Sequence, residues 1–232
     1  MCIDHKKSMT LSLDKSRIIV YNITKVPEQK VGVQMTLDSI ACIRTGMVSG
    51  RKKAQGNMVD CVQYHLLNLK CVETTGNLNL DYIEDYFARE QLNPDFLTRK
   101  GDVLIRLSYP YSSVLIDDEK TCGLLVPSHF AIVRTDSSKV LPEYLLWFLR
   151  QDSTYQQILQ NSSGSTAFGT ISSGFIGSLN IRVLPLEKQQ LIGQLMLLSK
   201  KEQDLLFRLA KEKAAFNKEV LNNLFNRFKG EE

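Results

Sequence analysis

The side chains that could contact a nucleic acid gather in three polar loops. The first loop, 45–58, contains the basic run Arg51, Lys52 and Lys53 and has no acidic residue. Together with Arg44 just before it, this run offers cations to phosphate groups, a strong interaction that carries no sequence information. We therefore expect 45–58 to be a basic, phosphate-contacting loop.

The second and third loops have side chains suited to reading bases. Arg106 could bind guanine through two hydrogen bonds, and aromatic and hydroxyl groups follow it in the chain. The neighbours of Arg106 in this second loop are Tyr109, Tyr111 and Ser112. The third loop, 163–170, is rich in glycine and hydroxyl residues, and its candidate contacts are Ser165, Thr166 and Phe168. A solvated turn without a ligand is the alternative for each loop.

Recognisable catalytic motifs are missing from the sequence. Residues 93–96, NPDF, resemble the N-P-P-[YF] motif of amino-methyltransferases, but the third position is Asp95 and no G-x-G is present to bind a nucleotide-derived cofactor. There is no P-loop, G-x-S-x-G or H-E-x-x-H motif. The histidines are isolated, and the 5 cysteines form no C-x-x-C pair. We expect reduced thiols, no metal site, no cofactor and no enzymatic activity.

Length and composition suit one domain with an additional element. The 232 residues are 43% hydrophobic, enough to bury a substantial core, and the formal charge of +4 permits an anionic partner without requiring one. The start of the sequence has no secretory apolar region, and no stretch approaches the ~18 apolar residues of a membrane span. We expect a cytoplasmic protein that makes no membrane contact.

The loops must be positioned by a domain of short strands and helices. Residues 1–30 form a poorly patterned arm with one candidate strand at 17–23. Alternation and apolar runs predict strands at 61–72, 103–107 and 176–183, a helix at 141–159, and a short helical or irregular piece at 81–90. Further short apolar segments lie at 113–116, 124–126 and 130–133. Several short strands close together favour a mixed or antiparallel sheet. The expected class is α+β, with a mixed-sheet recognition domain at 31–185.

A long helix is predicted at the C-terminal end, 186–232. From Leu186 to Phe228 there is no proline and only one glycine, which permits a helix of about 40 residues, near 60 Å long. Steps of three, four and seven residues define an apolar stripe, interrupted at Glu202 and Glu212. The apolar stripe consists of Leu191, Leu195, Leu198, Leu205, Leu209, Phe216, Val220 and Leu224. We expect a coiled-coil-like partner interface; packing of the helix on its own domain is the alternative.

Four linked stretches resemble the DNA specificity subunit of type I restriction-modification systems. They are LDSIACIRTG at 37–46, GDVLI at 101–105, LPEYLLWFL at 141–149 and LNIRVLPLEKQQLI at 179–192. Their order and spacing extend over most of the chain. Two departures stand out. The usual P-L-x-E-Q has Lys188 in place of Glu, and the chain has room for one target recognition domain where a full subunit has two.

The resemblance implies a non-catalytic, sequence-specific DNA-binding subunit. Members of the family bind one half-site of double-stranded DNA with each recognition domain and recruit modification subunits that hold the methyltransferase chemistry. This chain would then direct a DNA adenine methyltransferase, with or without a restriction subunit, to a bipartite target. A half-length subunit recovers two domains if two copies form a homodimer, antiparallel through their long helices.

Three alternatives remain open from the sequence. The chain could pair with a different half-subunit, which would give an asymmetric target. It could be a protein-interaction module that uses the helix and binds no DNA. A standalone methyltransferase would bind S-adenosylmethionine, which we do not expect.

Overall fold

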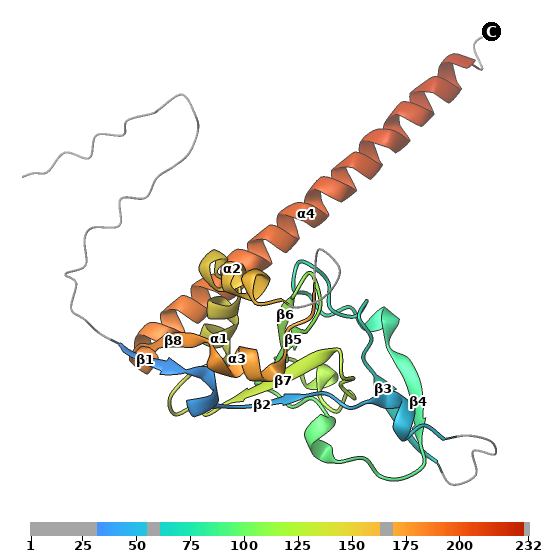
Figure 1. The fold of residues 1–232 in the computed structure, drawn as a ribbon. Coiled ribbons are helices and arrows are strands. Elements are labelled where there is room, and N and C mark those ends of the chain that lie inside the picture. The colour runs from blue at the N-terminus through green and yellow to red at the C-terminus, as the bar shows by residue number, and fades with distance from the viewer. Residues whose placement is uncertain (1–31, 55–60, 163–168, 230–232) are drawn as a thin grey trace, which may run out of the picture. The chain divides into compact units, whose positions relative to one another are not determined.

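The computed structural model describes residues 32–54, 61–162 and 169–229, which form an α+β fold of antiparallel sheets and helices (Figure 1). The expected fold class is confirmed. The candidate strand at 17–23 and the arm 1–30 lie outside the described residues. The same holds for Ser165, Thr166 and Phe168.

A four-stranded antiparallel sheet forms the centre of the domain. Its strand order is β2 (Ala41–Thr45), β7 (Phe130–Thr135), β5 (Val103–Arg106) and β6 (Ser113–Leu115). The apolar run in β5 has a simple cause, because both faces of this strand are covered. Val103, Leu104 and Ile105 are all fully buried. A strand buried on both faces lacks the alternation of a half-exposed strand.

Two further antiparallel pairs flank this sheet. β1 (Val33–Thr36) pairs with β8 (Asn180–Val183), which brings the two ends of the domain together. β3 (Val62–Leu66) pairs with β4 (Glu84–Ala88). Short 3-10 helices fill the connections, at Leu37–Ser39, Ser49–Arg51, Leu80–Tyr82, Pro94–Phe96 and Glu119–Thr121.

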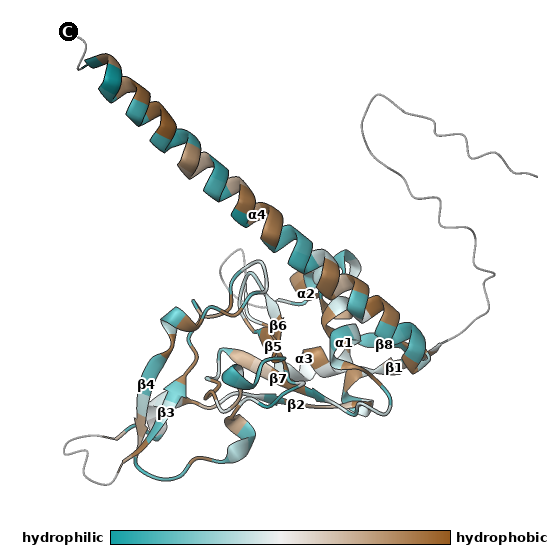
Figure 2. Cartoon of the chain, turned by 180° about the vertical axis from the view of Figure 1, so that it is seen from behind, coloured by the Kyte–Doolittle hydropathy of each residue, from teal (hydrophilic) through white to brown (hydrophobic). Residues whose placement is uncertain are grey.

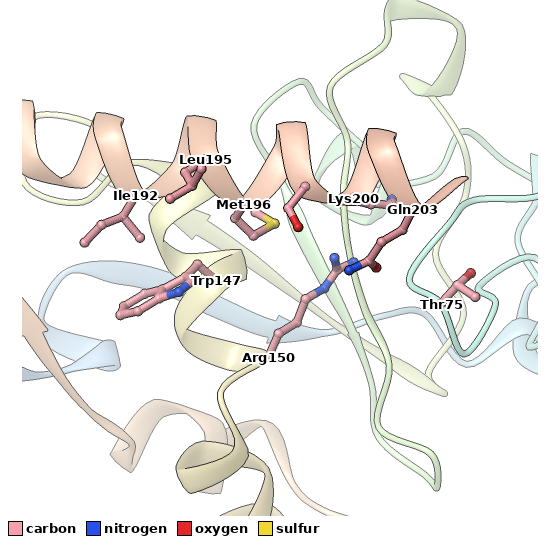
Figure 3. Close-up of a pocket in the computed structure, with 9 residues that line it drawn as sticks. Thr75, Trp147, Arg150, Ile192, Leu195, Met196, Lys200 and Gln203 are labelled. Atoms are coloured by element: carbon pink, nitrogen blue, oxygen red, sulfur yellow. The ribbon is translucent and has the colours of Figure 1, made fainter. Parts of the chain in front are cut away.

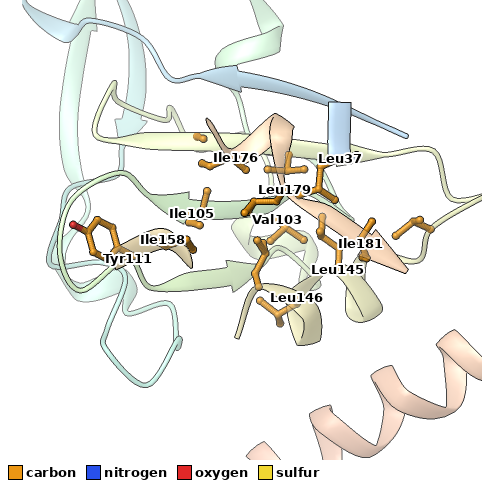
Figure 4. Close-up of a cluster of buried hydrophobic side chains, with 14 of the residues drawn as sticks. Leu37, Val103, Ile105, Tyr111, Leu145, Leu146, Ile158, Ile176, Leu179 and Ile181 are labelled. Atoms are coloured by element: carbon orange, nitrogen blue, oxygen red, sulfur yellow. The ribbon is translucent and has the colours of Figure 1, made fainter. Parts of the chain in front are cut away.

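The main core lies between one face of the central sheet and three short helices (Figure 4). These are α1 (Pro142–Leu149), α2 (Asp152–Gln160) and α3 (Ser173–Ser178). Pro142 occupies the first turn of α1, where its missing N–H costs nothing. The Ser172 side chain caps α3 by accepting a hydrogen bond from the backbone N–H of Phe175 at 3.0 Å. A second core cluster, which includes Leu104, Phe130 and Ile132, packs on the opposite face of the sheet.

Helix α4 (Leu186–Lys229) begins on the domain and extends well beyond it (Figures 1 and 2). The part of α4 that packs on the domain, which we call its seat, lies close to α1. A Cβ added at Gly193 would lie 2.6 Å from the Cβ of Glu143 in α1. Gln189, fully buried, accepts from the backbone N–H of Leu141 at 2.8 Å and donates to the carbonyls of Lys139 at 2.8 Å and Leu184 at 2.7 Å. The predicted long helix is therefore present.

Three local predictions need correction. The segment 81–90, expected to be helical or irregular, contains strand β4, because Tyr86 and Ala88 alternate into a small core beneath β3. The expected strand 176–183 is divided into helix α3 and the shorter strand β8. The expected helix 141–159 is two helices, α1 and α2, with Arg150 and Gln151 between them.

Candidate nucleic-acid interface

The first and second predicted loops leave the central sheet from the same end. Antiparallel pairing places Thr45 of β2 opposite Ala131, and Arg106 of β5 opposite Phe130. Ser113 of β6 lies opposite Ile105 on the other side of β5. We call this end of the sheet the loop end. It brings together segments that lie more than 50 positions apart in the sequence, which loop composition alone did not predict.

The second and third loops are joined directly. Ser108 forms an antiparallel bridge with Thr170, and the Ile171 backbone N–H donates to the Leu107 carbonyl at 2.9 Å. The Tyr111 hydroxyl donates to the Gly169 carbonyl at 2.8 Å. These bonds fix 169–171, which follow the segment 163–168 that lies outside the described residues, against the loop that follows Arg106.

The two tyrosines of the second loop occupy different environments. Tyr111 is only 4% exposed and belongs to the main core, whereas Tyr109 is 45% exposed. The two rings meet edge to face, with centroids 6.2 Å apart. Tyr111 therefore supports the loop from beneath and is not accessible to a bound base, contrary to our expectation. Tyr109 is the aromatic side chain that this loop presents to solvent.

Arg106 lines a hollow of about 420 Å³ on the surface. Lys70 and Tyr82 line the same hollow, and the Lys70 ammonium lies 5.9 Å from the centre of the Tyr82 ring. Burial lowers the pKa of Arg106 from its ordinary value, but a guanidinium remains charged at neutral pH. The sequence did not single out Lys70 or Tyr82, because only the fold brings them beside Arg106. Ser112 is half-buried, and its carbonyl accepts the Arg106 N–H at 2.9 Å.

The basic run of the first loop lies along strand β4. Lys53 bridges to Ala88, and the Arg89 side chain donates to the Lys53 carbonyl at 2.9 Å. Lys52 is paired with Glu90 at 2.7 Å, an exposed ion pair that lowers the Glu90 pKa. Exposed pairs of this kind contribute little to stability and are screened by salt. The backbone of Arg51 ends a 3-10 helix.

Arg44 has a carboxylate partner within the domain. Its guanidinium contacts Asp95 at 2.6 Å, and Asp95 also pairs with Arg99 at 2.9 Å and Arg134 at 3.4 Å. Arg134 in turn forms an ion pair with the buried Asp102 at 2.8 Å. Asp95 thus anchors an arginine network, and the hydrogen bond from Arg44 lowers its pKa. This is a structural role for the NPDF segment, and it makes Arg44 a weaker candidate for phosphate contact.

The start of α4 and the end of α1 form a groove of about 390 Å³ (Figure 3). Trp147 lies on one wall, opposite Ile192 and Met196 of α4. Arg150 and Lys200 both donate to the Gly76 carbonyl, at 3.1 and 3.0 Å. Burial lowers the pKa of Lys200, with a further contribution from the Arg150 charge. Because the Gly76 carbonyl holds both cations, the groove is part of the surface on which α4 packs against the domain.

The apolar stripe of α4 faces away from this seat, except that Leu195 also lines the edge of the groove. The buried residues of the helix are Gln189 and Gly193, whereas Leu191, Leu195 and Leu198 are 68%, 66% and 64% exposed. Beyond the domain, the remaining members of the stripe are also exposed. Packing on its own domain therefore accounts for one face of α4 and leaves the apolar stripe uncovered.

Comparison with solved structures identifies the fold. A structure from a study of complex assembly and conformational transition in the type I R-M system has a TM-score of 0.61 at 15% identity, over 85% of this chain. The HsdS subunit from Thermoanaerobacter tengcongensis has a TM-score of 0.54 at 14% identity, over 79% of this chain. The type I restriction-modification S subunit from M. genitalium has a TM-score of 0.50 at 14% identity, also over 79% of this chain.

The chain has the fold of the type I specificity subunits. It spans about half of the chains it matches, which are covered over 48%, 45% and 42% of their lengths. No protein-family model matches the sequence, and no curated protein matches it. The fold agrees with the resemblance found in the sequence.

The described residues show neither a metal-binding cluster nor a membrane-spanning helix. Within them, no group of three or more histidine, cysteine or acidic side chains is placed to hold a metal ion. No helix in the same ranges is long and apolar enough to cross a membrane. The cysteines of this part of the chain, Cys42, Cys61, Cys71 and Cys122, are free thiols.

Proposed function

We propose that this chain is a sequence-specific DNA-binding subunit that directs a partner DNA adenine methyltransferase to its target. The observation that carries the proposal is the loop end of the central sheet, which gathers cationic and aromatic loops within a type I specificity-subunit fold. Chemistry is assigned to the partner, in keeping with the absence of recognisable catalytic motifs in the sequence.

The proposed contacts divide into two kinds. Arg51, Lys52 and Lys53 position the duplex through phosphates. Base reading is assigned to Arg106 and Tyr109, helped by Ser112 and by Ser165, Thr166 and Phe168 of the third loop. Lys70 and Tyr82 join the set because they line the hollow of Arg106. Tyr111 leaves it because its ring is buried, and Arg44 because Asp95 holds its guanidinium.

Salt dependence tests the phosphate contacts. Alanine at 51–53 should weaken binding to all duplex sequences and lower the slope of log K against log salt by about one for each phosphate that the variant no longer neutralises. Lys100→Ala is a matched control, because Lys100 precedes β5 at the sheet end opposite the loop end. An unchanged slope in the 51–53 variant would contradict this assignment.

The helix supplies the proposed protein partners. Its apolar stripe would pair with the same stripe of a second copy, giving two recognition domains and a bipartite target. A separate set of exposed apolar residues lies about 100–160° around the helix from Leu191. This set consists of Phe207, Leu221, Phe225 and Phe228, and we assign it to the modification subunit.

Selection from random duplexes tests the function as a whole. The chain, alone and with a candidate methyltransferase subunit, should enrich a bipartite and palindromic motif. An asymmetric motif would indicate pairing with a different half-subunit, and no enrichment in either arm would favour an interaction module without DNA binding. Binding of S-adenosylmethionine by the isolated chain would favour a standalone methyltransferase.

A further inference from the structure

Two opposite charges lie on the outward face of α4 at a regular spacing. Leu191, Glu202, Lys213 and Leu224 follow one another at intervals of eleven residues. Eleven residues are close to three helical turns, so side chains at this spacing remain on one face of a straight helix. Glu202 and Lys213 therefore interrupt the apolar face at two related positions.

These two charges have no partner within the described part of the chain. No ion pair in the described ranges includes Glu202 or Lys213, and both side chains are exposed. The face on which they lie is uncovered even beside the domain, where Leu191 and Leu195 are exposed. A second helix can therefore run along this face for its full length, and Figure 2 shows apolar residues continuing along α4 past the domain.

We propose that two copies pair antiparallel in one register, set by Glu202 of each copy meeting Lys213 of the other. The same register places Leu191 opposite Leu224 and Leu195 opposite Val220. At the centre it places Leu206 opposite Leu209. This inference rests on the antiparallel pairing of two copies already expected from the resemblance, and it adds the register and the residues that select it.

Flanking charges support the same register. Lys201 and Glu212 lie together on one flank of the stripe, and in an antiparallel pair this flank meets its own copy. Lys201 then comes within about two residues of Glu212 on the partner helix. At the two ends Arg227 lies directly opposite Lys188, a like-charge contact that the adjacent Glu187 offsets only in part, so the end charges do not select this register.

A parallel pair would meet the opposite electrostatics. It would place Glu202 against Glu202 and Lys213 against Lys213 at stripe positions, and like charges in contact across an interface are costly. Glu202 and Lys213 thus favour one direction and oppose the other. Antiparallel pairing also holds the two Gln189 anchors about 55 Å apart, since the residue opposite Gln189 is Asn226.

Charge reversal tests the register in the full-length chain. Glu202→Lys or Lys213→Glu creates two like-charge contacts in a symmetric antiparallel pair, and each should weaken dimerisation about tenfold or more in sedimentation equilibrium. The two single variants mixed together should form a 1:1 heterodimer, because both contacts become complementary again. The double variant should dimerise like the parent chain. Lys218→Glu is the matched control, since it makes the same charge change about 140° around the helix from Lys213.

The outcomes separate this register from other arrangements. Dimerisation that is unchanged in both single variants, or not restored in their mixture and in the double variant, would overturn the proposal. A parent chain that stays monomeric at high concentration would overturn it as well. A parallel pair predicts that the parent dimerises no better than the single variants. DNA selection with the same samples reports on the proposed function separately, because single-domain DNA binding does not require this register.

Discussion

The buried amide of Gln189 offers the sharpest test of how α4 is seated. Leucine at this position keeps the approximate size of the side chain and removes its polar group. Three backbone groups then lose a partner, namely the N–H of Leu141 and the carbonyls of Lys139 and Leu184. All three partners lie in segments that α4 must contact to hold its angle to the domain.

The expected cost follows from those three bonds. A buried polar group left without a partner costs about 1–3 kcal/mol, and the apolar leucine recovers part of that loss. We expect Gln189→Leu to lower the free energy of unfolding by about 3 kcal/mol or more. In a domain of this size that corresponds to a fall of roughly 6–12 °C in Tm.

The measurement is denaturant unfolding of the full chain, followed by fluorescence of its one tryptophan, Trp147, which lines the groove beside α4. Gln190→Leu is the matched control, because the neighbouring glutamine is exposed, and its unfolding free energy should stay within about 0.5 kcal/mol of the parent. If Gln189→Leu behaves like this control, the amide does not hold the helix and the argument fails.

Two further predictions concern the domain itself. Gly193→Ala should destabilise the chain by about 1–3 kcal/mol in the same unfolding assay, because the new Cβ would lie 2.6 Å from the Cβ of Glu143. This cost exceeds the gain of about 1 kcal/mol in helix propensity that alanine brings. A stabilised variant would show that α1 and α4 separate easily. The lowered pKa of Asp95, caused first by its hydrogen bond with Arg44, gives stability that is present above the unfolded-state pKa and is lost as pH falls through the folded-state value. Unfolding measured from about pH 6 to about pH 2.5 should therefore show less acid dependence in Asp95→Asn than in the parent, and equal slopes would contradict this.

Patterns that depend on local sequence were predicted well. Helix α4 follows from a long run without proline, and strand β5 from a compact apolar run. Strand β4 was missed because its acidic start, Glu84 and Asp85, hides the alternation of Tyr86 and Ala88. The division between α3 and β8 was missed for a different reason. Gly177 allows α3 to approach Asp38, a contact that only the fold reveals.

Candidate contacts depended on burial, which loop composition does not report. Tyr109 and Tyr111 look equivalent in the sequence, yet a positive φ of 55° at Tyr111 accompanies a ring turned into the core. Arg44 looks like a free cation until Asp95, which is 51 positions away, is brought beside it. Residue type thus suggested the candidate loops, whereas tertiary contacts decide which of their described side chains remain available.

Helix α4 has two faces in different environments. Gln189 and Gly193 fix one face of the helix to the domain, and the apolar stripe lies exposed on another face. The angle between the loop end and the stripe is therefore set within a single chain, before any partner binds. A partner that docks on the stripe need not spend binding free energy on ordering the helix, which is the benefit of preorganisation. Changes to the stripe should accordingly alter assembly while leaving the loop end intact.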